Sequence, residues 1–117
     1  LAPLEEYVVS RRFGPGHEAI DLAARAGTPV GASADGIVLG RGEDSVFGKF
    51  VLLEHQQGFQ SYYGHLQEWK AEIGDSVMAG ATLGLVGSSG RSSAPHLHFE
   101  VRRYGERLDP ERNITFQ

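Results

Sequence analysis

The sequence predicts a mainly β protein, with a single domain built on a largely antiparallel sheet of short strands and long loops. Glycine accounts for 16 of the 117 residues, which is about twice its usual share of roughly 7%. So much glycine argues against a helical bundle and for many turns between short strands. The length is that of one ordinary domain. We place this domain at residues 1–117, with residues 1–13 as an irregular N-terminal segment.

The first element is ambiguous from its composition. Residues 18–26 are rich in Ala and Leu, as in a short helix. However, the segment is short, follows Gly14-Pro15-Gly16 and runs into Gly27-Thr28-Pro29. Because glycine and proline on both sides interrupt a helix, we expect an extended strand and a loop here.

The rest of the chain consists of short apolar runs separated by turns, which is typical of strands. The run at 50–55 and its return at 59–66 predict a hairpin around Gln56-Gln57-Gly58. The other predicted elements are strands at 36–40, 82–87 and 96–102, a tight connection at 74–80, a short helical turn around Trp69, a polar loop at 87–93 and a turn-like tail from Asp109.

Composition excludes several classes of function. Fifteen acidic and eleven basic residues give a net charge of −4, so a general phosphate-binding or nucleic-acid-binding surface is not expected. Cysteine is absent, which excludes disulfides, a catalytic thiol and cysteine-based metal sites. No segment has the roughly 18 apolar residues that span a bilayer, and no secretory signal is visible. Since the chain begins at Leu1 and not at Met, we expect a processed or excised piece, and a lost export signal stays open.

Two pairs of side chains have the spacing of metal ligands. In His96-Leu97-His98, residues i and i+2 of a strand point to one face, so both imidazoles converge. His17 and Asp21 are four residues apart, which places them on one side of a strand or a helix. Together the pairs offer three ligands and an open position for water, as catalytic zinc sites require. Each pair alone also fits solvated side chains, and spacing does not bring residue 17 to residue 98.

Three further polar residues have plainer interpretations. His65 lies near the end of a predicted strand, as a half-buried histidine bonded to the backbone would. His55 lies at the hairpin turn, and we expect it to be exposed and without a role. Glu100 shares a strand face with His98 and is a candidate hydrogen-bond partner for a ligand imidazole, but an exposed carboxylate at the strand end is the favoured interpretation.

The order of these motifs resembles that of the lysostaphin-type, or LytM-type, zinc endopeptidases, which act on bacterial cell walls. The match is an ordered series across about residues 14–110, and not a single motif. In chain order the series is His17-Xaa-Xaa-Xaa-Asp21, Gly27-Thr28-Pro29-Val30, Asp35-Gly36-Xaa-Val38, Phe47-Gly48, Tyr63-Gly64-His65-Leu66, Gly74-Asp75-Xaa-Val77-Xaa-Xaa-Gly80, Leu83-Gly84, Val86-Gly87 and Pro95-His96-Leu97-His98-Phe99-Glu100-Val101.

The resemblance implies a function and a set of site residues. By position, it implies His17, Asp21 and His98 as ligands of one Zn²⁺ per domain. It implies His65 and His96 as the catalytic pair that activates the metal-bound water and stabilises the transition state. The implied reaction is hydrolysis of peptide bonds in peptidoglycan cross-links or stem peptides, in the periplasm, at the cell surface or after secretion. Implied partners are peptidoglycan peptides and other cell-wall enzymes, with no nucleic acid and no membrane span in this chain.

Two positions depart from the family pattern, and two other functions stay open. Ala19 and Ala94 stand where the family commonly has glycine, and we expect only a local adjustment unless position 19 needs a positive φ. The first alternative is a non-catalytic domain of the same fold that binds cell wall or activates an amidase, although all five polar positions are kept. The second is a phosphoryl-carrier domain with a barrel-like β fold, in which His65 and His96 would carry phosphate and Asp21 would lack a purpose.

Overall fold

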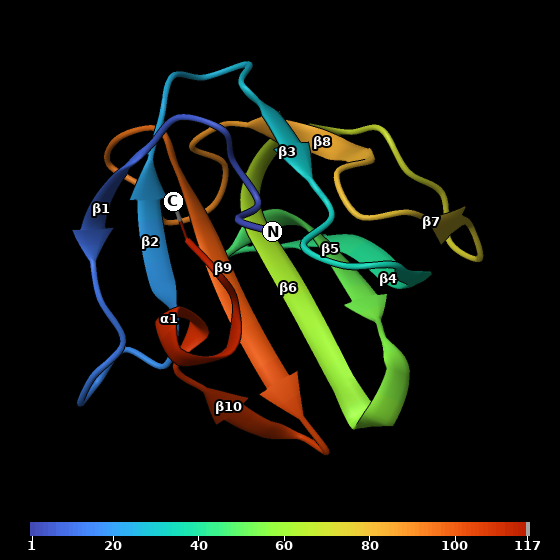
Figure 1. Cartoon of the computed structure of the whole chain (residues 1–117). Helices are drawn as coiled ribbons and strands as arrows, with labels where there is room; N and C mark the ends of the chain where they lie inside the picture. The colour runs from blue at the N-terminus through green and yellow to red at the C-terminus, as the bar shows by residue number, and fades with distance from the viewer. Residues whose placement is uncertain (117) are drawn as a thin grey trace.

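The protein folds into one sheet, as the glycine-rich sequence predicts. The computed structural model describes residues 1–116, and every strand pair in this part of the chain is antiparallel. The sheet has ten strands (Figure 1). Within the described residues, no helix has the length and apolar character needed to cross a membrane. In chain order the elements are β1 Val8–Arg11, β2 Ile20–Ala23, β3 Pro29–Gly31, β4 Gly36–Asp44, β5 Gly48–Glu54, η1 Gln56–Gly58, β6 Phe59–Trp69, β7 Ser76–Val77, β8 Thr82–Val86, β9 His96–Arg103, β10 Glu106–Leu108 and α1 Pro110–Asn113.

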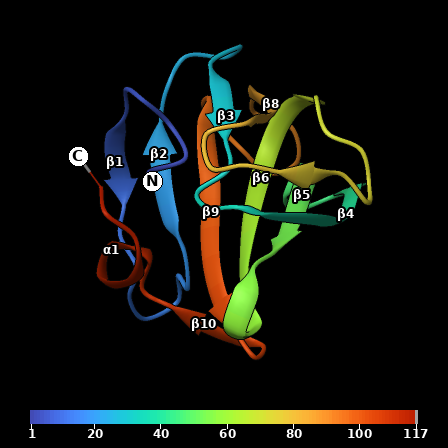
Figure 2. The same ribbon diagram turned by 45° about the vertical axis from the view of Figure 1, so that its right-hand side comes forward.

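Two long neighbouring strands, β6 and β9, run through the middle of the molecule (Figures 1 and 2). The strand order is β1-β2-β9-β6-β5-β4-β7, while β10 pairs with β9 and β8 pairs with both β6 and β3. Because β2 and β9 are neighbours, the chain that follows residue 17 lies beside the strand that carries residues 96 to 98. The topology thus supplies the long-range juxtaposition that the spacing of the motifs left open.

The hydrophobic core lies on one face of the central strands, because successive side chains of a strand point to opposite faces. Leu97, Phe99 and Val101 of β9 are buried in this core, and Tyr63 of β6 packs beside Phe99. The alternate residues of β9 therefore occupy the other face. Further core residues come from the N-terminal segment and from strands across the sheet: Leu4, Ile20, Leu22, Val30, Val38, Val51, Leu53, Leu66, Leu83 and Val86.

A chain of hydrogen bonds connects the core to the hairpin turn. The Tyr63 hydroxyl accepts from the Ser33 backbone N–H at 3.0 Å and lies 2.7 Å from Ser61 Oγ. Ser61 Oγ lies 2.7 Å from His55 Nε2, while His55 Nδ1 donates to the Asp35 carbonyl at 2.7 Å. The expectation that His55 is exposed is therefore wrong. Its imidazole is half-buried and ties the β5–β6 turn to the loop before β4.

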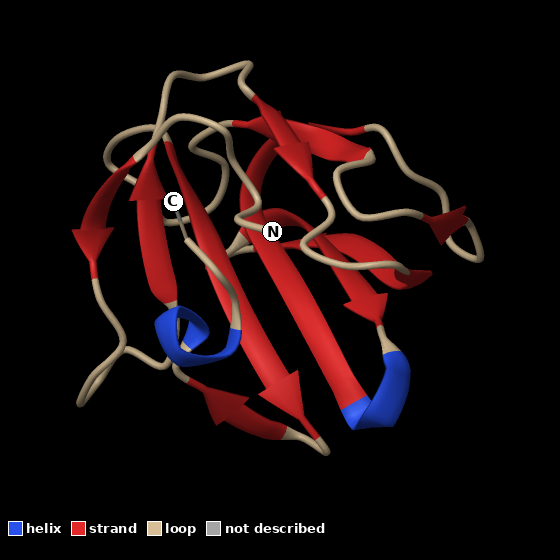
Figure 3. Ribbon diagram, viewed as in Figure 1, coloured by secondary structure: helices blue, strands red, loops and turns tan. Residues whose placement is uncertain are grey.

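Several local predictions are confirmed, and others are wrong (Figure 3). The ambiguous segment forms strand β2, and the β5–β6 hairpin turns at residues 56–58. The N-terminal segment is not wholly irregular, because β1 pairs with the edge of β2. No helical turn forms around Trp69. Strand β6 continues through this residue, because pairing with Gly84 of β8 outweighs local preference.

Candidate metal centre

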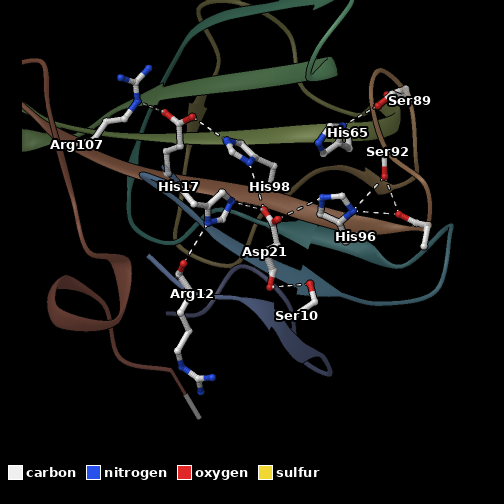
Figure 4. Close-up of polar contacts among 12 residues, drawn as sticks. Ser10, Arg12, His17, Asp21, His65, Ser89, Ser92, His96, His98 and Arg107 are labelled. Atoms are coloured by element: carbon white, nitrogen blue, oxygen red, sulfur yellow. Dashed lines mark hydrogen bonds and ion pairs between the residues drawn. The ribbon is translucent and has the colours of Figure 1, made fainter. Parts of the chain in front are cut away.

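Pairing of β2 with β9 brings the two candidate ligand pairs together. Asp21 lies directly opposite His98 in the register, and opposite residues of antiparallel strands share a face. His17 precedes β2 in a turn closed by two backbone hydrogen bonds with Gly14, and its imidazole lies beside Asp21 (Figure 4). One ligand atom from each of His17, Asp21 and His98 lies within 4.8 Å of the others.

Two of the donor groups, the imidazoles of His17 and His98, flank a buried oxygen of the third, the Asp21 carboxylate. His17 Nε2 and His98 Nδ1 are each 3.3 Å from Asp21 Oδ1. This oxygen is buried and has no hydrogen-bond partner among the described residues. A buried polar atom without a partner is costly, and a cation held between the imidazoles and the carboxylate would satisfy it. Imidazole nitrogen and carboxylate oxygen are donors that suit zinc, so this set of residues fits that ion.

Outer hydrogen bonds set the tautomers of the two histidines. His17 Nδ1 lies 3.2 Å from the carbonyl oxygen of Arg12, which can only accept, so this nitrogen donates. His98 Nε2 lies 2.8 Å from a carboxylate oxygen of Glu100 and donates in the same way. In the neutral imidazoles, His17 Nε2 and His98 Nδ1 therefore keep the lone pairs that face Asp21.

The charges around Asp21 favour a positive charge at this point. Burial by itself raises the pKa of Asp21, but the close contact with His98 and the positive charge that the neighbouring imidazoles can carry outweigh it and lower the pKa. Burial by itself lowers the pKa of His98, but contacts with Asp21 and Glu100 outweigh it and raise the pKa. Without a metal ion, a second proton on His98 is thus stabilised at the nitrogen that faces Asp21.

Glu100 is a buried part of the site and not an exposed residue at a strand end, so the favoured sequence interpretation is wrong. Its residue exposure is only 2%. Besides His98, its carboxylate accepts hydrogen bonds from Arg102 at 2.9 Å and from Arg107 at 3.1 Å. Burial raises the pKa of Glu100, but His98 and Arg102 outweigh this effect and lower it to about 2. Alternation along β9 places the residue beside His98, and its arginine partners remove the cost of burying the charge.

His65 reaches the same face through a β-bulge. Between the pairs Val51–Tyr63 and Lys49–Leu66, β6 has one more residue than β5. His65 takes a left-handed backbone conformation there, with φ of 61°, which is unusual for a residue other than glycine. Strict alternation after the core residue Tyr63 would turn His65 toward the core. The bulge instead re-aims its side chain, as bulges beside functional sites often do.

His65 and His96 form a second pair of imidazoles beside the ligand cluster (Figure 4). Their ring centroids are 4.6 Å apart. His65 Nδ1 donates to the Ser89 carbonyl at 2.7 Å, and His96 Nδ1 lies 3.0 Å from the Ala94 carbonyl, so each Nε2 keeps its lone pair. Burial lowers the pKa of His65, as do the neighbouring histidines, although the bond to Ser89 opposes them. Each imidazole of the pair therefore presents an acceptor nitrogen that can take up a proton.

An aromatic side chain from the β4–β5 turn covers the histidines. Phe47 stacks on His98 with ring centroids 4.4 Å apart and lies 6.0 Å from His65. Its backbone carbonyl accepts the His65 N–H, so one residue holds the bulge and shields a ligand imidazole. No chemical role for Phe47 is predicted from the sequence, because an aromatic residue that covers a site has the same sequence pattern as one in the core.

The substitution of alanine at position 19 needs no left-handed backbone. Among the described residues other than glycine, positive φ occurs at Gln57, His65 and Tyr104, and Ala19 is not among them. Ala19 is buried, with an exposure of 1%, so its methyl group fits within the packed interior. The departure from the glycine pattern therefore leaves the ligand cluster in place.

A cluster of two imidazoles and one carboxylate, with two further imidazoles on the same sheet face, defines the class of site found in metal-dependent hydrolases. The chain belongs to peptidase family M23, whose family model matches residues 15–110. The resemblance to lysostaphin-type peptidases is thereby confirmed.

Two curated relatives carry different names. The chain is 43% identical over 94 residues to the DD-carboxypeptidase/endopeptidase Mpg of Neisseria meningitidis, covering 80% of this chain and 22% of the relative. It is 40% identical over 90 residues to the murein hydrolase activator EnvC of Escherichia coli, covering 77% of this chain and 22% of that protein. The chain thus spans about a fifth of the length of each relative.

Solved structures share the fold across nearly the whole chain. The catalytic domain of lysostaphin from Staphylococcus simulans matches with a TM-score of 0.85 and 30% identity, covering 92% of this chain and 91% of that one. A zinc-containing peptidase from Vibrio cholerae matches with a TM-score of 0.89 and 28% identity, covering 92% of this chain and 37% of that one.

Proposed function

We propose that this domain is a zinc-dependent endopeptidase that hydrolyses peptide bonds in the cross-links or stem peptides of peptidoglycan. The observation that carries the proposal is the convergence of the His17 and His98 imidazoles on a buried, unpartnered oxygen of Asp21. Membership of family M23 supports the reaction class. The peptidoglycan DD-endopeptidase ShyC of Vibrio cholerae, to which the chain is 32% identical over 120 residues, supports the choice of substrate. Because peptidoglycan is the proposed substrate, we place the action of the domain outside the cytoplasm.

In this proposal His17 Nε2, His98 Nδ1 and the Asp21 carboxylate hold the zinc ion. A bound zinc ion would supply Lewis acidity, which lowers the pKa of water and polarises a peptide carbonyl. His65 and His96 each present an Nε2 that can accept a proton from water and later donate one to the leaving amine. Once protonated, either imidazole also stabilises negative charge on the carbonyl oxygen. Phe47 keeps bulk water away from His98, and this strengthens the electrostatic interactions nearby.

Variants that separate metal binding from turnover test these roles. His17→Ala should lose bound zinc and activity together, whereas His65→Ala should keep zinc and lose peptide release. His55→Gln is the matched control, because it removes an imidazole outside the cluster and should keep both properties. Zinc content is measured by elemental analysis, and released fragments of purified wall are measured by mass spectrometry. Full activity in His17→Ala or His65→Ala, or in protein stripped by a chelator, would contradict the proposal.

A second candidate function is activation of another wall hydrolase, which the similarity to EnvC favours. In that case the domain would release no wall fragments alone and would increase their release by an added amidase. The same mass-spectrometric assay, run with and without the amidase, distinguishes the two functions. The complete set of five polar residues at one sheet face supports the enzyme over the activator.

A further inference from the structure

Two arginine side chains lie beyond Glu100 on the face of the sheet that carries the ligand cluster. Arg102 is two residues from Glu100 on β9, and Arg107 of β10 lies directly opposite Arg102 in the register. Residues so placed share a face. Arg102 donates to Glu100 Oε1 from Nε at 2.9 Å and approaches it from Nη2 at 2.7 Å, whereas Arg107 contacts the same oxygen through Nε at 3.1 Å.

Glu100 does not need Arg107 to compensate the cost of burying its charge. One carboxylate oxygen is already bound by two nitrogens of Arg102, and the other accepts from His98. Arg107 therefore leaves one positive charge without a counter-charge in this group of two arginines and one carboxylate. The chain as a whole carries a net charge of −4, so a local positive excess is not a general property of its surface.

Arg107 also keeps donors that no described residue uses. Its side chain is 41% exposed, against 22% for Arg102 and 3% for Glu100. Arg107 contacts Glu100 through Nε, so its terminal nitrogens remain available as donors. A guanidinium offers parallel N–H groups in the geometry that a carboxylate accepts with both oxygens. Glu100 fixes this guanidinium in advance, which reduces the ordering cost of binding.

The contacts of Glu100 limit the distance between Arg107 and the ligand cluster. Arg107 Nε is 3.1 Å from one oxygen of Glu100, and the other oxygen is 2.8 Å from His98 Nε2. An upper limit for the distance between Arg107 Nε and a cation on His98 Nδ1 is the sum of these two contacts, the width of the carboxylate, the width of the imidazole and one metal–nitrogen bond. This sum is about 12 Å. That span is about three residues of extended peptide.

We propose that Arg107, positioned with Arg102 by Glu100, forms a subsite for a carboxylate group that the peptide substrate carries within about three residues of the scissile bond. The substrate class is thus an acidic peptide, and an amidated peptide is disfavoured. The subsite rests on the proposed function for its role in catalysis, but its affinity for a carboxylate is measurable without turnover.

The test compares a cross-linked wall peptide whose carboxylates are free with the same peptide in which every carboxylate is a carboxamide. Affinities are measured by calorimetry on zinc-loaded protein in a His65→Ala background, so that the peptide stays uncut. We expect the free acid to bind about tenfold more tightly than the amide, as for a charge-assisted hydrogen bond. Arg107→Gln should reduce this preference to about twofold or less and keep the zinc content, and Arg107→Lys should keep only part of it.

Arg103→Gln is the matched control, because Arg103 neighbours Arg102 on β9 but lies over Phe59, with its guanidinium carbon 4.7 Å from the ring centroid. This variant should keep the full preference for the free acid. Equal binding of acid and amide, an unchanged preference in Arg107→Gln, or no measurable binding of either peptide would each overturn the subsite. Turnover by the parent protein is scored separately. Absence of hydrolysis with the preference intact would overturn the proposed function and leave the subsite standing.

Discussion

Glu100→Gln is the sharpest test of how the site is held together. The substitution keeps the size of the side chain and removes its charge. If the new amide nitrogen faces His98 Nε2, it donates where the carboxylate accepted, and the histidine must move its proton to Nδ1. If it faces Arg102 and Arg107, two donors oppose it. Either orientation leaves a buried group unsatisfied, and the first removes the lone pair that a metal ion needs.

The size of the effect follows from the contacts. Loss of a hydrogen-bond partner to a metal-ligating histidine costs about 10-fold to 100-fold in metal affinity, which is about 1.4–2.7 kcal/mol. The pKa of Glu100 is about 2 in the folded protein against an ordinary value of 4.5. A folded pKa below the unfolded one stabilises the fold above about pH 4.5, and this stabilisation is lost as the pH falls toward 2. It amounts to about 3 kcal/mol at neutral pH.

Two assays measure these effects. A competition titration with a zinc chelator gives the zinc affinity, and urea unfolding of metal-free protein between pH 7 and pH 2 gives the free energy of unfolding. Glu100→Gln should be less stable than the parent at pH 7, and the difference should shrink as the pH falls toward 2. Glu106→Gln is the control, because Glu106 is exposed on β10. Parental zinc affinity in Glu100→Gln would refute the tautomer argument, and a pH-independent stability difference would refute the charge argument.

Two further predictions concern the scaffold. Tyr63→Phe should lower the free energy of unfolding by about 1–3 kcal/mol, because the buried Ser33 N–H loses its acceptor; a loss below about 0.5 kcal/mol in urea unfolding would contradict this. Gly48→Ala should lower stability and turnover while zinc stays bound, because Gly48 has a φ of +61° and a Cβ there would lie 2.2 Å from Ser89 Oγ. Gly40→Ala, where a Cβ meets no atom within 4 Å, is its control, and equal unfolding midpoints of the two variants would oppose the steric explanation.

The sequence by itself determined the fold class and the residues that could act as ligands. Abundant glycine and short apolar runs predict an antiparallel sheet, because these are local properties of the chain. The alternation of His96 and His98 about Leu97 likewise follows from strand geometry, which needs no tertiary contact. The position of His17 four residues before Asp21 has the same local origin.

Only the tertiary structure decided how these residues work together. The pairing of β2 with β9 joins segments nearly eighty residues apart, and local patterns carry no information about such pairing. The bulge at His65 turns its side chain to the face opposite to the one that strand alternation predicts. Alternation along the sequence therefore gives the wrong face for this residue. From the sequence, Glu100 is predicted to be an exposed carboxylate. The arginine on β10 that helps to neutralise it lies beyond a turn, so strand alternation does not reveal this partner. Burial of a charge is decided by partners that only the folded chain assembles.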